Sequence, residues 1–317
     1  MNKYHLIICL IILSIISLFI GVSNISLIDL FNDPDRLRIF LISRVPRLIS
    51  ILIVGSGMSV CGVVMQQMTG NRFVSPSTAG TFEFCKLGIL FAILVMPSAS
   101  ISFKMLLAFI FSLVGTSLFM MMINHMKYKD GTFVPLIGIM FGGIVSSLTS
   151  FIAYRYDLIQ NINSWLQGRF TLVVAGSYEL LYIGIPVFII IYLYTNQFTI
   201  ASLGNEFASN LGLNYRLVVN IGLAVCALMS SIVVVTIGSI PFIGVIIPNI
   251  VSKYKGDNLK DTLPIIAISG ALFVLVCDMI ARILIAPHEI PIGVVCGGIG
   301  SFIFLFLILR RPKNAKA

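Results

Sequence analysis

The sequence predicts an all-α membrane protein with about ten transmembrane helices. Of its 317 residues, 58% are hydrophobic and only 10% are charged, and the mean hydropathy is +1.05. Such a composition lacks the polar surface that a water-soluble fold requires. Ten apolar runs set the helix count and fall at about 4–22, 47–69, 78–96, 103–125, 133–153, 178–195, 217–237, 240–252, 263–286 and 291–309. We treat 1–317 as a single transmembrane domain.

The first run begins after Lys3 and resembles a signal peptide, but no small-x-small cleavage site follows it, so we keep it as a helix. Most of the later runs are long enough to cross a hydrocarbon core of roughly 30 Å at about 1.5 Å per residue. The run 240–252 is too short to do so unaided. Ten crossings place both termini on one side of the membrane.

The basic residues orient this topology. Of 21 Lys and Arg residues, twelve fall on the side of the termini, seven fall on the other side, and Lys86 and Arg282 lie within helices. Because cytoplasmic loops carry the excess of basic residues, both termini are predicted to be cytoplasmic. The net charge of +9 forms no dense basic face, so we predict no nucleic-acid partner.

Several kinds of chemistry are not indicated. The six cysteines lie in apolar runs without a Cys-x-x-Cys pair, and there are only three histidines, so we predict neither disulfides nor a metal site, and no cofactor. No Gly-Lys dipeptide, serine elbow or His-Glu-x-x-His motif is present. The chain is therefore not expected to be an enzyme, and any ATP must be hydrolysed by another chain.

Four arginines between residues 36 and 47 fall on the predicted outer side, where positive charge is disfavoured. Two explanations stay open. The arginines could bind a partner, or they could pair with Asp29, Asp33 and Asp35 in the same loop.

Charged residues inside the helices come in two pairs. Glu83 and Lys86 are three residues apart, and Asp278 and Arg282 are four apart, so each pair could be mutually satisfied. An ionisable residue in a membrane helix also suggests function, and a structural role is about equally consistent with the spacing.

Two further stretches point to function. In the segment 197–216, Leu203, Phe207 and Leu211 recur every four residues on a predicted cytoplasmic loop, as in helices that lie on a membrane surface or bind a soluble partner. In 237–249, two prolines and two glycines, including Pro241 and Pro248, interrupt an apolar segment. Broken helices are tolerated in membranes where they are covered by protein or line a cavity, so this stretch is a candidate pathway element.

These residues carry a resemblance to the permease subunits of binding-protein-dependent ABC importers for ferric siderophores, haem and cobalamin. It covers nearly the whole chain, and its motifs occur in order: Arg44-Val45-Pro46-Arg47, the Gly/Gln-rich second helix ending in Asn71 to Pro76, Leu203-Gly204 to Leu211-Gly212, Gly238 to Asn249, Gly256 to Pro264, Asp278 to Arg282, and Glu289 to Gly293.

The resemblance implies ten helices, with an inverted repeat of helices 2–5 and 7–10, and two permease subunits around one path. It implies a binding protein docked on Arg44, Arg47 and Arg282, and ATPase subunits that bind the segment 197–216. The residues implied in ATPase coupling are Leu203, Gly204, Glu206, Phe207, Leu211 and Gly212. Those we place along the translocation path are Gln66, Gln67, Pro241, Pro248 and Asn249.

Two departures from the family pattern narrow the substrate. Arg72 to Pro76 replaces the common Asn-Pro-Leu-Ala-x-Pro, and Pro248-Asn249 replaces Pro-His. Both resemble the branch for catecholate-type and related ferric siderophores, which usually pairs two different permease chains. We expect an apolar, Met-rich path wall, which does not name the siderophore.

The sequence thus predicts a permease for a ferric siderophore in the bacterial cytoplasmic membrane. The rival is a secondary transporter driven by an ion gradient. That mechanism would require unpaired carboxylates or a sodium site near the middle of the membrane. Only Glu83 and Asp278 are available, and each has a nearby cation.

Overall fold

A computed structural model describes residues 3–21, 33–98, 100–126, 133–176, 178–256 and 258–309, and within these ranges the chain is helical and contains no strand. The elements are α1 (Lys3–Phe19), α3 (Pro34–Ile39), η1 (Phe40–Arg44), α4 (Val45–Thr69), α5 (Thr81–Val95), α6 (Ile101–His125), α7 (Phe133–Arg155), α8 (Ile159–Leu166), η2 (Phe170–Leu172), η3 (Glu179–Ile183), α9 (Gly184–Leu193), α10 (Thr195–Ala201), α11 (Asn205–Asn210), α12 (Tyr215–Thr236), α13 (Ile243–Lys255), α14 (Leu259–Ile283) and α15 (Ile292–Leu309). Each predicted apolar run overlaps at least one of these helices.

Among the described residues, five continuous helices are long and apolar enough to cross a membrane: Pro34–Thr69, Ile101–His125, Phe133–Arg155, Tyr215–Thr236 and Leu259–Ile283. A sixth span results if the pair Glu179–Leu193 and Thr195–Ala201, bent by 59°, is counted as one. The helices α1 and α15 are apolar but shorter. The fold is therefore an all-α multispanning bundle, and the count of ten crossings stays a prediction.

The arginine-rich stretch before the second run is helical, so the prediction of a loop there was wrong. α3, a π-helical turn at Phe40–Arg44 and α4 form one helix of 36 residues. Asp33 caps its start by accepting from the backbone N–H groups of Asp35 and Arg36, and Pro34 occupies the first turn. At about 1.5 Å per residue the helix is about 54 Å long, which exceeds the hydrocarbon core.

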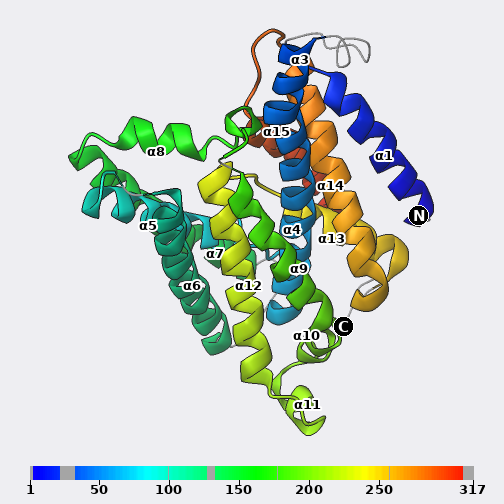
Figure 1. Cartoon of the computed structure of the whole chain (residues 1–317). Coiled ribbons are helices and arrows are strands. Elements are labelled where there is room, and N and C mark those ends of the chain that lie inside the picture. Colours follow the sequence, from blue (N-terminus) through cyan, green and yellow to red (C-terminus); the bar gives the residue numbers. More distant parts are fainter. Residues whose placement is uncertain are drawn as a thin grey trace.

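The helix α4 runs through the centre of the bundle. α1 and α14 lie on one side of it, and α5, α6, α7 and α8 lie on the other (Figure 1). Small residues allow close crossings between α4 and its neighbours. A Cβ atom at Gly55 would lie 2.6 Å from the carbonyl oxygen of Gly270 in α14, and one at Gly62 would overlap the backbone of Gly244 in α13.

The predicted break between the seventh and eighth runs is confirmed. α12 ends at Thr236 and α13 begins at Ile243, and Gly238 and Phe242 between them have φ values of +99° and +67°. α13 has 13 residues, too few to span a membrane.

The unwound stretch between α12 and α13 is held by backbone from the end of α8 and beyond. Arg169 N–H donates to the Ile237 carbonyl at 2.8 Å, and the Ser239 hydroxyl donates to the Leu166 carbonyl at 2.8 Å. The broken backbone is thus satisfied by protein, as membrane burial requires.

Candidate docking, coupling and transport sites

Five charged residues form what we call the arginine cluster: Arg44, Arg47, Asp278, Arg282 and Glu289. Arg47 lies in the first turn of α4 and bridges two carboxylates, with Nη2 2.8 Å from Asp278 Oδ1 and Nη1 2.9 Å from Glu289 Oε2. Arg282 Nη2 lies 2.5 Å from the second oxygen of Asp278, so the pairing predicted from their spacing is confirmed. The cluster joins α4, α14 and the loop before α15.

Two of these arginines also hold the end of α1. Arg282 donates to the carbonyl oxygens of Ser17 and Ile20 at 2.9 and 2.7 Å and to the Ser17 hydroxyl, and Arg44 donates to the Ile20 carbonyl. The last carbonyls of a helix have no intrahelical partner and carry partial negative charge. The guanidinium groups therefore cap α1 and fix it against α4 and α14.

The arginine cluster is mostly hidden from solvent. The docking role implied for its arginines would instead place their side chains on the outer surface of the protein. Arg44 and Arg282 are buried, and the side chain of Arg47 is 11% exposed. The alternative pairing within the N-terminal stretch is seen among the described residues for Arg36, whose Nε lies 3.3 Å from Asp33 Oδ2. Asp29 lies outside the described residues. The three arginines expected to dock a partner are thus engaged inside the protein.

Glu289 was not singled out as a charge partner, although it opens one of the quoted motifs. Its carboxylate accepts from Arg47 and, at 2.8 Å, from the hydroxyl of Thr171. Burial alone would raise the pKa of Glu289, but the charge of Arg47 and these hydrogen bonds outweigh burial and leave that pKa below its usual value. The residue is therefore ionised at neutral pH.

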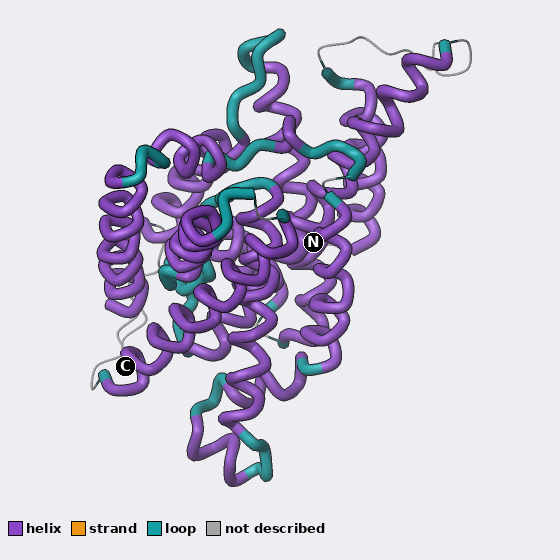
Figure 2. The backbone as a smooth tube through the Cα atoms, turned by 60° about the vertical axis from the view of Figure 1, so that its left-hand side comes forward, coloured by secondary structure: helices purple, strands orange, loops and turns teal. Residues whose placement is uncertain are grey.

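The segment around α11 has the opposite character. Leu203, Phe207 and Leu211 are 60%, 53% and 60% exposed. α11 projects beyond the end of the bundle opposite α3 (Figure 1), and a view turned by 60° shows the same projection (Figure 2). A hollow of about 520 Å³ is lined by Leu203, Gly204, Asn205, Glu206, Phe207 and Asn210. We call residues 203–212 the α11 segment.

The two glycines of the α11 segment serve its backbone conformation. Gly204 and Gly212 have φ values of +97° and +78°, which other residues rarely adopt. Apart from the glycines themselves and their two chain neighbours, no atom of the described residues lies within 4 Å of where either Cβ would be. They shape the turns on either side of α11 and leave open space beside them.

The residues expected along the path meet near the crossing of α4 and α13. Gln66 is buried and its side-chain amide donates to the Gly244 carbonyl at 3.1 Å. The Asn249 amide donates to the carbonyls of Arg72 and Val245 at 2.7 and 2.6 Å. Pro248 is buried, and Gln67 and Pro241 are half-buried. The polar groups of Gln66 and Asn249 therefore tie α13 to neighbouring backbone within the subunit.

Glu83 and Lys86 pair as predicted, with Lys86 Nζ 2.7 Å from Glu83 Oε1. They lie on α5, and Gly80 and Glu83 line a hollow of about 220 Å³ beside α7.

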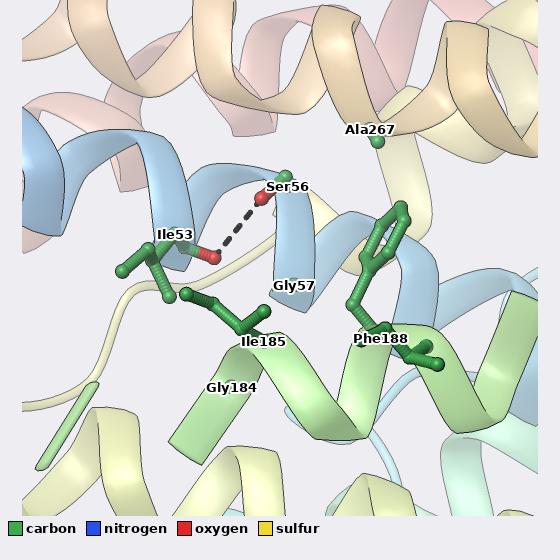
Figure 3. A pocket seen from close by; sticks show the side chains of 8 residues that line it. Ile53, Ser56, Gly57, Gly184, Ile185, Phe188 and Ala267 are labelled. Carbon is green, nitrogen blue, oxygen red and sulfur yellow. Dashed lines mark hydrogen bonds between the residues drawn. The ribbon is translucent and has the colours of Figure 1, made fainter. Parts of the chain in front are cut away.

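A separate crevice of about 220 Å³ between α4, α9 and α14 is almost wholly apolar. It is lined by Ile53, Ser56, Gly57, Gly184, Ile185, Phe188, Ile189 and Ala267 (Figure 3). The Ser56 hydroxyl bonds to carbonyls of its own helix, at 2.6 Å for Leu52 and 3.2 Å for Ile53. The one hydroxyl proton of Ser56 is therefore already used within α4 and is not available to a polar ligand.

A multispanning helical bundle with a broken helix and an exposed apolar segment at one end has the features of a transport permease. The FecCD transport family matches residues 9–310. A petrobactin import system permease protein of Bacillus subtilis, YclN, is 54% identical over 99% of this chain and 100% of its own length. A ferric-anguibactin transport system permease protein of Vibrio anguillarum, FatD, is 38% identical over 94% of this chain and 95% of its own length.

A solved structure supports the same class. It is described as an inward-facing conformation of a metal-chelate type ABC transporter, and it matches with a TM-score of 0.83 and 25% identity over 98% of this chain and 99% of that one. The protein is a membrane-embedded transport component of an ABC importer and not an enzyme. The chain belongs to the FecCD transport family, which contains the iron-siderophore permeases. These comparisons give no support to the ion-coupled alternative.

Proposed function

We propose that this chain is the permease subunit through which a ferric siderophore crosses the bacterial cytoplasmic membrane, powered by separate ATPase subunits. The observation that carries the proposal is the similarity over almost the full length to permeases named for petrobactin and ferric anguibactin. We assign this chain a substrate of the same kind, an iron chelate of a catecholate-type or related siderophore.

In this proposal the ATPase subunits bind the α11 segment. Three large apolar side chains, Leu203, Phe207 and Leu211, are exposed together at one end of the bundle. Apolar anchors surrounded by polar groups are typical of helix-in-groove interfaces. A nearby hollow lined in part by Glu206 and Asn210 leaves room for a partner. This end, and with it both termini, is cytoplasmic.

The extracytoplasmic binding protein docks at the opposite end, where α3 and the arginine cluster lie (Figure 1). Three arginines face two carboxylates in the cluster, so it keeps a net positive charge. Arg38 on α3 is exposed and adds to it. Arg44, Arg47 and Arg282 act on an acidic partner through this field, which steers association and is screened by salt.

A second permease subunit, identical or homologous, completes the translocation path. The residues that take part in the movement of that path lie near the crossing of α4 and α13. They are Gln66 and Gln67 of α4, Pro241 in the broken stretch between α12 and α13, and Pro248 and Asn249 within α13.

Reconstitution tests the proposal. The permease is co-expressed with an ATPase subunit and a second permease subunit of a siderophore import system, placed in proteoliposomes, and given a binding protein loaded with ferric petrobactin or ferric anguibactin. We expect uptake of radioactive iron that requires ATP on the side of the membrane where the ATPase subunits lie. This uptake should continue when ionophores collapse the ion gradients. Uptake that needs an ion gradient and no ATP contradicts the proposal.

A further inference from the structure

The unwound stretch between α12 and α13 ends in a backbone conformation that is unfavourable for its residue. Phe242, the residue before α13, has a φ of +67° and a ψ of −17°, in the left-handed region. A residue with a Cβ atom populates this region less than the right-handed one by a factor of about five to thirty. Such a conformation persists only where the surrounding structure determines it, and it is often found at switch regions.

The chain before Phe242 is fixed to the end of α8 and the residues that follow it. Two hydrogen bonds between 237–239 and 166–169 were described above, and a third runs from the Ser239 N–H to the Leu166 carbonyl at 3.2 Å. Gly168 packs directly on this stretch, since a Cβ atom there would lie 2.6 Å from the Ser239 carbonyl oxygen. Residues 237–239 therefore form one body with the chain after α8.

The chain after Phe242 is fixed to a different element, α4. A Cβ atom at Gly62 would overlap the backbone of Gly244, so α4 and α13 cross with their backbones in contact. The side-chain amide of Gln66 donates to the Gly244 carbonyl at 3.1 Å. The helix α13 therefore forms a second body with α4, at a position one or two residues beyond Phe242.

Only Ile240, Pro241 and Phe242 connect these two bodies along the chain. Ile240 is buried, and the ring of Pro241 fixes its φ angle. Hinges in proteins are a few residues at the ends of elements that absorb a change in backbone angles. Phe242 is thus the connecting residue at which the direction of α13 can change, and it is also the one in the unfavourable conformation.

One face of α15 presents a row of glycines to this connection. The row consists of Gly293, Gly297 and Gly300. Cβ atoms at these three positions would lie, in order, 3.0 Å from the Ser239 carbonyl oxygen, 3.6 Å from Pro241 Cγ and 2.9 Å from Phe242 Cβ. Glycines allow close approach without side chains that interlock, so the connection can turn against α15.

The ring of Phe242 packs on two other aromatic rings. Its centroid lies 6.0 Å from that of Phe304, which in turn lies 5.7 Å from that of Phe73 in an edge-on arrangement. All three side chains are half-buried, so part of each is not covered by the described residues. These contacts hold Phe242 in its present conformation from one side only.

We propose that Phe242 is the hinge of the broken helix and that α13 turns about it when the permease passes between its two access states. Phe242 is left-handed in the conformation described here and leaves that region in the other state, so its backbone strain opposes the described conformation. The residue is a positioning residue and needs no contact with the chelate. The inference rests on the proposed transport function, which requires two access states.

Distance measurements in the assembled transporter test the hinge. The host is Cys9→Ser, since Cys9 is the exposed one among the six cysteines. Spin labels are attached at Asn220→Cys on α12 and Tyr254→Cys on α13, both exposed positions. The distance between them is measured by pulsed electron paramagnetic resonance without nucleotide and with a non-hydrolysable ATP analogue. We expect two distances in the unmutated hinge, one for each access state, and a single distance under both conditions overturns the inference.

The decisive comparison is between Phe242→Gly and Phe242→Ala in this labelled host. Both remove the ring, and they differ only in the Cβ atom that makes the left-handed region unfavourable. At an analogue concentration that populates both states, the glycine variant should favour the conformation described here over the alanine variant by a factor of about five to thirty. Equal population ratios in the two variants would show the same strain in both states and overturn the inference.

A matched control comes from Asp157, the other described non-glycine residue with a positive φ, at +54°. It is exposed between α7 and α8, away from the connection to α13. Asp157→Gly and Asp157→Ala should therefore give equal population ratios. A shift between them as large as that at Phe242 overturns the inference, because strain relief would then act from any position.

A second pair keeps the test decisive if Phe242→Ala does not fold. Phe242→Leu and Phe242→Asn have side chains of similar size, but asparagine adopts the left-handed region more readily. The asparagine variant should favour the described conformation over the leucine variant, and equal ratios overturn the inference. The unmutated transporter in the same vesicles is the reference, since absence of ATP-dependent iron import there refutes the proposed function instead.

Discussion

The arginine cluster and the α11 segment lie at opposite ends of the bundle and differ in how far their groups are satisfied within the subunit (Figure 1). Arg47 contacts two carboxylates, and Arg282 contacts one carboxylate and the end of α1. Phe207, by contrast, is more than half exposed. Residues of the first kind stabilise the subunit itself, and those of the second kind are available to another chain. Mutations in the two regions should therefore differ in what they disrupt.

The largest effect should come from Arg47→Ala. It leaves Glu289 and the buried Asp278 with one cation fewer, and breaking a buried ion pair costs about 3–5 kcal/mol. We expect a sharp fall in folded yield and melting temperature in detergent. Arg38→Ala, at an exposed position of α3, is the control and should leave both unchanged. Normal yield of Arg47→Ala with loss of binding-protein association would instead make the cluster a direct docking surface.

Phe207→Asp should produce the complementary result. An unpaired charge at a buried interface position weakens association by about 2–4 kcal/mol, and this residue is exposed in the subunit, so its folding is not affected. We expect normal membrane insertion and melting, no copurification with the ATPase, and no import.

Two variants control for this experiment. Phe207→Leu keeps an apolar anchor and should retain the ATPase, and Ser209→Asp places the same charge on an exposed neighbour and should have little effect. If Phe207→Asp copurifies normally and substrate still stimulates hydrolysis, the α11 segment lies on the membrane surface and does not transmit energy.

A double-mutant cycle sharpens the description of the arginine cluster. Asp278→Asn and Arg282→Gln each remove one partner, and we expect a coupling of about 1–3 kcal/mol in melting experiments. The Arg282 variant alone should lose more than the Asp278 variant, because it also releases the carbonyls of Ser17 and Ile20. Additive losses would show that the pair is not coupled.

The smallest effect concerns pH. The pKa of Glu289 is lowered in the folded protein, so its contribution to stability is complete above its unfolded value of 4.5 and is lost as pH falls through the lower folded value. We expect melting temperatures that do not depend on this residue between about pH 5 and 8, and a decline below about pH 4.5 that is smaller in Glu289→Gln. Identical acid profiles of the two proteins would contradict this.

Local patterns in the sequence were sufficient to predict where the apolar helices lie and which charged residues pair within one helix. Hydropathy located all ten apolar runs, and spacing identified the pairs Glu83 with Lys86 and Asp278 with Arg282. The break after Thr236 followed from its prolines and glycines. These features depend on neighbours within a few positions, which a sequence displays directly.

Contacts between distant segments were not predictable in this way. Arg47 and Glu289 are 242 positions apart, and nothing in either neighbourhood specifies the other. The early start of the second helix was missed because its charged residues are typical of a loop, although Asp33 followed by Pro34 is a recognisable helix start. α8 was missed because polar residues interrupt its apolar ones.

The π-helical turn at Phe40–Arg44 determines the direction in which the arginines point. On an uninterrupted α-helix, Arg36 and Arg47 would share a face, because eleven positions are close to three whole turns. The wider turn shifts the angular phase of everything after it by about a quarter of a turn. Arg36 therefore stays beside Asp33 at the surface, while Arg47 turns toward Asp278. One irregular turn thus lets a single helix present positive charge to water at its tip and to buried carboxylates about three turns later.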